Sequence, residues 1–81
     1  MNVRVRLFAV ARQWAGRDSV TLDLPDGASL AQLRRRLAEE VPQLSQAMGQ
    51  MTFAIGAQYA DDRATIPPDA EVACIPPVSG G

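Results

Sequence analysis

Few side chains in this sequence are able to carry out chemistry. Histidine and lysine are absent, which removes the commonest general base, the commonest metal ligand and every side-chain amine. The single cysteine, Cys74, stands between Ala73 and Ile75, where a free cysteine usually serves as a small buried hydrophobic residue. Asp61 and Asp62 are adjacent carboxylates without the further spaced oxygen ligands that a hard cation requires. We therefore expect no metal site, and a chain that uses the active site of a partner.

The remaining candidate is the end of the sequence, which reads Pro76-Pro77-Val78-Ser79-Gly80-Gly81. Prolines favour an extended course and join neither a helix nor a sheet ladder, and six extended residues reach roughly 20 Å. The last two residues lack a Cβ, so this tip fits a tunnel too narrow for side chains. The group delivered there is the α-carboxylate of Gly81. It needs activation, for instance as an acyl-adenylate, by machinery on other proteins.

Composition limits the partners and the compartment. The net charge of −1 argues against nucleic acid or an anionic membrane as a partner, because both attract a basic surface. No apolar run approaches the length of a membrane span, and the first residues lack the apolar core of a signal peptide. We expect a cytoplasmic protein with one domain over residues 1–75 and an extended functional tail over residues 76–81.

Alternation of apolar and polar residues predicts the strands. The first two are expected to form an antiparallel pair. The last is apolar on both faces, which is typical of a strand in the middle of a sheet. We expect strands at residues 3–8, 19–24, 52–55 and 71–75, with a short and poorly defined segment at 58–60.

One main helix is predicted between the second and third strands. Ser29 is its candidate N-cap, and Gln32 stands at the spacing of a capping box. An apolar stripe follows at helical spacing, and Pro42 ends the helix. Shorter helical turns are expected at residues 9–15 and 43–50. The order of elements predicts an α+β fold, with a mixed sheet curled over one main helix.

For two groups of surface residues, a binding role is weighed against a purely structural one. Arg34–Arg36 form a basic triplet, but Glu39 and Glu40 lie four residues beyond its last two members, so a solvated face of paired charges is favoured over an anion site. Phe8 lies on the strand face opposite the core valines, with Trp14 nearby in sequence. These aromatics either belong to a partner-binding patch or cover an edge of the core, and the sequence leaves both open.

The stretch Leu7–Arg12 (LFAVAR), together with Glu71-Val72-Ala73 and the ending described above, resembles the small subunit of molybdopterin synthase (the MoaD family). The resemblance covers essentially the whole chain and implies the ubiquitin-like β-grasp fold. It implies that a ubiquitin-activating-like adenylyltransferase, using ATP, adenylates Gly81, which then becomes a thiocarboxylate. It further implies a heterotetramer of two small and two large subunits, in which the sulfur passes to cyclic pyranopterin monophosphate. No cofactor is expected on this chain itself.

The same resemblance implies site residues. Gly81 is the sulfur carrier and Gly80 its spacer, and Arg12 is the leading charged contact. The expected partner-binding residues are Phe8, Arg12, Ile75, Pro76, Pro77, Val78 and Ser79. The sequence departs from the family at Gly56, where asparagine is common, and at Asp69-Ala70, where a glycine is common. It also departs at Cys74 and Ile75, where aromatic residues are common.

Two other functions use the same carboxylate. One is the sulfur carrier of thiamine biosynthesis, whose chains are usually shorter and lack both the Leu-Phe-Ala start and the double proline. The other is a ubiquitin-like modifier joined through Gly81 to lysines of target proteins. Without lysine this chain forms no isopeptide-linked chains of its own, but single attachment stays open.

Overall fold

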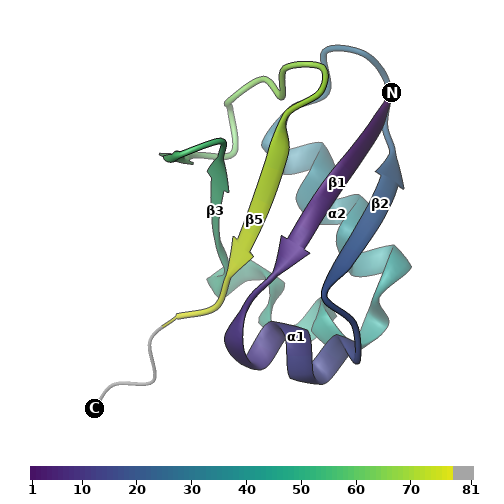
Figure 1. The fold of residues 1–81 in the computed structure, drawn as a ribbon, viewed down its shortest axis with the longest axis vertical. Coiled ribbons are helices and arrows are strands. Elements are labelled where there is room, and N and C mark those ends of the chain that lie inside the picture. The colour runs from purple at the N-terminus through teal and green to yellow at the C-terminus, as the bar shows by residue number, and fades with distance from the viewer. Residues whose placement is uncertain (78–81) are drawn as a thin grey trace.

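Five strands form one mixed sheet, and the main helix packs behind it (Figure 1). The computed structural model describes residues 1–77. The strands lie in the order β2-β1-β5-β3-β4, and β1 and β5 are parallel whereas the other neighbours are antiparallel. The strands are β1 (Asn2–Leu7), β2 (Ser19–Asp23), β3 (Thr52–Ile55), β4 (Gln58–Ala60) and β5 (Glu71–Ile75). The helices are α1 (Ala9–Ala15), α2 (Leu30–Glu40) and the 3₁₀ helix η1 (Pro42–Gln50).

The predicted strands are present, with small corrections at their ends. The bounds expected for β3 and β5 agree with the structure, and the short segment at 58–60 forms β4 beside β3. The first strand ends at Leu7 and not at Phe8, because Phe8 is already the N-cap of α1. The second strand ends at Asp23. The antiparallel pairing of β1 with β2 is confirmed.

The core lies between the sheet and α2. The inward side chains of β1 and β5 pack against the apolar stripe of α2, and burial of this apolar area is the main stabilising term. β5 lies between β1 and β3, as its two apolar faces predicted. The fully buried residues at the centre of this layer are Val5, Leu30, Leu33, Leu37, Phe53, Val72 and Cys74.

A capping box starts α2, as the sequence predicted. The Gln32 amide donates to the Ser29 hydroxyl at 3.2 Å, and the Ser29 amide donates to Gln32 Oε1 at 2.8 Å. Two amides that lack a partner within the helix are thereby satisfied. The helix stops at its C-cap, Val41, before Pro42.

Two of the departures from the resembling family lie at turns with positive φ. Gly56 has φ +62° in the turn between β3 and β4, a left-handed conformation that asparagine also tolerates. Asp69 has φ +65°, and aspartate is one of the few non-glycine residues often found there. The turns that precede β4 and β5 therefore each hold a residue type that tolerates positive φ.

Arg34 turns inward from α2 and fastens η1 to it. Its Nη1 donates to the carbonyl oxygens of Met48 at 2.6 Å and Met51 at 3.0 Å. Its Nη2 and Nε donate to Asp62 Oδ1 at 2.9 and 3.1 Å, and its guanidinium carbon lies 4.9 Å from the centre of the Phe53 ring. With nine residues, η1 is longer than most 3₁₀ helices. The hydrogen bonds from Arg34 to the carbonyls at its end therefore help to stabilise it.

The solvated-face interpretation of the basic triplet is thus wrong for one member and right for another. Arg36 is paired with Glu40 at 3.0 Å across one turn of α2, as expected. The Arg34 side chain is only 21% exposed, because its acceptors come from η1 and from the loop after β4, which a helical wheel does not contain.

Cys74 belongs to the core, as the sequence indicated. Its side chain is fully buried on β5, opposite Phe53 of β3. Burial raises the pKa of the Cys74 thiol from 9.0 to about 11, and the nearby Arg34 guanidinium opposes part of that rise. A buried thiol that stays protonated at neutral pH is a poor nucleophile.

Replacement of Arg34 by methionine should destabilise the fold, because the η1 carbonyls lose a charged donor. We expect a loss of about 2–3 kcal/mol in the free energy of unfolding, measured by urea denaturation. Arg36→Met on the same helix is the matched control and should cost at most about 0.5 kcal/mol, because exposed pairs one turn apart contribute little. Equal losses in the two variants would show that the Arg34 contacts are energetically unimportant.

The Cys74 thiol should make stability depend on pH in the alkaline range. Between pH 9 and about 11 the unfolded thiol ionises while the folded one keeps its proton, so the free energy of unfolding falls as pH rises. Below pH 9 this contribution is fully present. Urea denaturation from pH 8 to 10.5 should show the decline in the wild-type chain and lose it in Cys74→Ala. An identical decline in both chains would assign it to another group.

Candidate functional site

The central strand β5 carries the chain out of the sheet at a proline. Ile75 makes the last pairing of β5, with Thr52, and the ladder stops because Pro76 has no N–H to donate. Pro76 is buried and Pro77 is exposed, so the first proline is seated in the body of the protein. We call Ile75–Pro77 the tail root. The predictions for Val78, Ser79, Gly80 and Gly81 fall outside the described residues.

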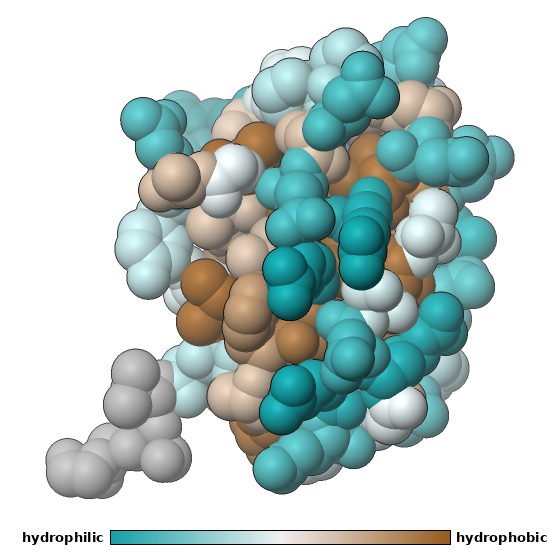
Figure 2. Space-filling view, viewed as in Figure 1, coloured by the Kyte–Doolittle hydropathy of each residue, from teal (hydrophilic) through white to brown (hydrophobic). Residues whose placement is uncertain are grey.

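A groove of about 700 Å³ lies on one side of the tail root and is called the root groove below. Phe8 and Trp14 from α1 and its N-cap form one wall, while Ala47 and Gln50 of η1 form another. A smaller hollow of about 360 Å³ flanks the tail root on its other side, lined by Thr52 and Tyr59. Figure 2 shows apolar residues gathered along β5 and near its end, while the surface over β1 and β2 is more hydrophilic. The tail root therefore stands between two hollows.

Three large apolar side chains are exposed among residues 1–77, and all three line these hollows. Phe8 is 40% exposed, Trp14 48% and Tyr59 74%. Exposed aromatic side chains gathered at one place are typical of protein-binding surfaces. Aromatic residues are enriched among the few interface residues that contribute most of the binding energy. The exposure of Phe8 and Trp14 favours the patch over a cover for the core edge.

Backbone geometry fixes Phe8 beside the tail root. Its amide lies 3.3 Å from the Cys74 carbonyl oxygen of β5, to which it donates. Ala9 then takes φ +51°, a strained conformation for a residue with a Cβ, and this turns the chain directly from β1 into α1. The Arg6 guanidinium carbon lies 5.5 Å from the centre of the Phe8 ring, a cation–π distance.

The structure separates Arg12 from the rest of the predicted set. Phe8, Ile75, Pro76 and Pro77 come together at the root groove. Arg12 lies on α1 with a 59% exposed side chain, and its Nε is 3.9 Å from Asp18 Oδ1. It lines neither hollow at the tail root. The role of Arg12 as a charged contact stays a prediction.

Two residues of this surface were not among the predicted site residues. Tyr59 was missed because a three-residue edge strand gives almost no periodic signal, although a tyrosine there was a visible hint. Trp14 was noted as an aromatic near Phe8 but was not assigned a role. Its position on the helix predicted at residues 9–15 was the available signal.

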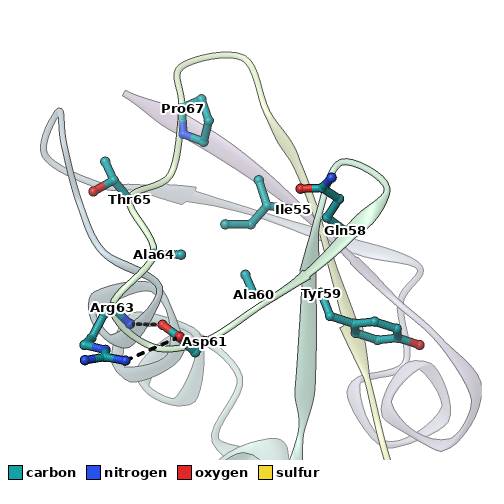
Figure 3. A pocket seen from close by; sticks show the side chains of 9 residues that line it. All are labelled: Ile55, Gln58, Tyr59, Ala60, Asp61, Arg63, Ala64, Thr65 and Pro67. Carbon is teal, nitrogen blue, oxygen red and sulfur yellow. Dashed lines mark hydrogen bonds and ion pairs between the residues drawn. The ribbon is translucent and has the colours of Figure 1, made fainter.

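A further hollow of about 590 Å³ lies between β4 and the loop that follows it (Figure 3). Ile55 and Ala60 point into it, whereas the Tyr59 ring points away. Asp61 accepts a hydrogen bond from the Arg63 amide at 2.8 Å and also lies 3.9 Å from its guanidinium, so these charges are satisfied locally. Nothing in this hollow suggests chemistry.

Residues 1–77 hold neither a metal-binding cluster nor a membrane-spanning helix. No three histidine, cysteine, aspartate or glutamate side chains gather as a metal site requires. No helix of these residues has the length and apolarity needed to cross a bilayer.

Comparison with solved structures identifies the fold. The crystal structure of SAMP1 from Haloferax volcanii superimposes with a TM-score of 0.88 over the whole of both chains, at 24% identity. A complex of subunits 1 and 2 of molybdopterin-converting factor from Helicobacter pylori contains a chain that matches with a TM-score of 0.71, at 22% identity over the whole of both chains. The predicted α+β, ubiquitin-like β-grasp fold is confirmed.

Comparison with curated sequences identifies the family. A molybdopterin synthase sulfur carrier subunit from Arabidopsis thaliana is 32% identical over all of this chain and 84% of the relative. A protein of the same name from Chlamydomonas reinhardtii is 35% identical over the whole of both chains. The model of the ThiS family matches residues 5–81. With a family match that includes the tail root and full-length relatives that are sulfur carriers, this chain belongs to the ThiS family.

Proposed function

We propose that this chain is the sulfur carrier subunit of a molybdopterin synthase and that the α-carboxylate of Gly81 carries the sulfur. The observation that carries this proposal is the full-length likeness to sulfur carrier subunits of that enzyme. Those relatives favour it over a thiamine-biosynthesis carrier and over a protein modifier. The tail root adds physical support, because the sheet ladder ends there beside an exposed apolar surface.

The chemistry is divided between this chain and its partners. An adenylyltransferase uses ATP to form the Gly81 acyl-adenylate, with release of pyrophosphate. A sulfur donor then attacks the acyl carbon and AMP leaves, which gives the thiocarboxylate. The sulfur passes to cyclic pyranopterin monophosphate, and water restores the carboxylate. This chain holds no cofactor in this scheme, and ATP is bound by the activating enzyme.

The partner of the final step is the large subunit of the synthase. The Helicobacter pylori structure contains subunits 1 and 2 of molybdopterin-converting factor together, which supports a partner of this kind. Phe8, Tyr59 and the tail root supply the apolar contact. Arg12, which is exposed on α1, supplies a charged one. We propose an assembly of two small and two large subunits, with Gly80 and Gly81 inside the large subunit's active site.

A reducing compartment suits this chemistry. The chain has one cysteine, which is unpaired and buried, and a thiocarboxylate is itself open to oxidation. We propose the cytoplasm, where ATP is also supplied.

Removal of Gly81 should abolish sulfur transfer and leave the fold unchanged, because the hydrophobic core is formed by residues between Val3 and Cys74. The wild-type chain, incubated with adenylyltransferase, ATP and sulfide, should gain ~16 Da, and thiol-specific derivatisation distinguishes this from ordinary oxidation. The shortened chain should show neither the added mass nor formation of the dithiolene product with the large subunit.

Cys74→Ala is the matched control for that deletion, since Cys74 carries the only side-chain thiol. It should retain most of the transfer activity. The proposal is refuted by transfer that persists without Gly81, and also by transfer that disappears in a well-folded Cys74→Ala chain.

A further inference from the structure

A second groove continues the root groove between α1 and η1. Its volume is about 470 Å³, and we call it the side groove. Trp14 stands on one side of it and three glutamines of η1, Gln43, Gln46 and Gln50, stand on the other. Trp14, Ala47 and Gln50 line both grooves, so the two form one continuous surface that starts at the tail root.

This continuous surface carries no charge. Charged residues make up 21% of the chain, yet none lines either groove. The three glutamines are exposed and follow one another at helical spacing, so they offer amide donors and acceptors along one edge. A surface depleted of charge, with an aromatic residue at its centre and polar groups at its rim, has the composition of a protein interface core.

The walls of the side groove are held in place before any partner arrives. The buried side chains of Leu44 and Met48 anchor the inner face of η1 in the core. The Arg34 guanidinium donates to the carbonyls of Met48 and Met51 at the end of η1. On the other wall, α1 ends at Gly16, whose amide closes the last turn by donating to the Arg12 carbonyl oxygen at 2.9 Å. A preformed groove binds with little loss of conformational entropy.

We propose that the side groove is the second half of the docking surface for the synthase large subunit, with Trp14 as its anchor. This inference rests on the function proposed above. An apolar side chain of the large subunit packs against Trp14 and Ala47, and its neighbouring backbone amides and carbonyls bind the glutamines.

Two observations favour the large subunit as the occupant. The side groove is continuous with the tail root, and the tail must reach the large subunit's active site for the final transfer. The uncharged character also fits a lasting subunit contact, because transient encounters depend more on charge for steering. The adenylyltransferase is the alternative partner for this groove. The experiment below distinguishes it from the large subunit.

The test measures binding of full-length Trp14→Ala to the large subunit of the same organism by isothermal titration calorimetry. We expect Kd to rise about 30-fold, since burying a central tryptophan contributes at least about 2 kcal/mol at interfaces. Trp14→Phe should keep Kd within about threefold, because a smaller aromatic ring still fills the groove. Arg35→Ala, an exposed change on α2, should leave Kd unchanged.

Each possible result separates this inference from the proposed function. Trp14 is about half buried in the free chain, so Trp14→Ala should lower the denaturation midpoint but keep a single cooperative transition, and binding is measured where both chains are fully folded. Equal affinity of Trp14→Ala and wild type would overturn the side-groove inference while leaving the carrier function intact. The same holds if Trp14→Ala slows Gly81 adenylation but binds the large subunit normally. Absence of any binding by the wild-type chain would refute the proposed function itself.

Discussion

The parallel pairing of β1 with β5 in the middle of the sheet determines where the site forms. Parallel strands end at the same edge, and the register places Leu7 opposite Cys74. The residues that follow, Phe8 after β1 and Pro76 after β5, are therefore brought together although they lie at opposite ends of the sequence. The hydrogen bond from the Phe8 amide to the Cys74 carbonyl continues the same pairing by one step. The position of Phe8 beside the tail root is thus a direct consequence of sheet topology.

The elements were predictable wherever the signal is local. Ser29 and Gln32 encode the start of α2 within four residues, and the two apolar faces of β5 indicate a central strand without knowledge of its neighbours. The end of β1 was harder, because alternation runs on through Phe8 while the backbone has already turned. That turn depends on Ala9 adopting a left-handed conformation, which no residue propensity favours.

The site was predictable only in part, for a different reason. The tail residues are recognisable by their types, but the hollows beside the tail root are made by segments far apart in sequence. Arg34 illustrates the limit: the helical wheel places it at the flank of the apolar stripe, and its inward turn depends on carbonyls of Met48 and Met51. Those carbonyls lie at the end of η1, and the sequence predicted a helical turn at residues 43–50 but not how that turn packs beside α2. Tyr59 was missed for the same reason, since its position depends on β4 pairing with β3.

The absence of reactive side chains is itself suited to carrying an activated carboxylate. An acyl-adenylate is attacked by any accessible amine or thiolate, and a lysine on the carrier would compete with the sulfur donor at high effective concentration. These 81 residues contain no lysine, and their one thiol is fully buried with a pKa near 11. Arginine supplies all of the positive charge, and its guanidinium stays protonated and unreactive at neutral pH. In the proposed function, an activated Gly81 would therefore meet neither a lysine nor an exposed thiol of its own chain.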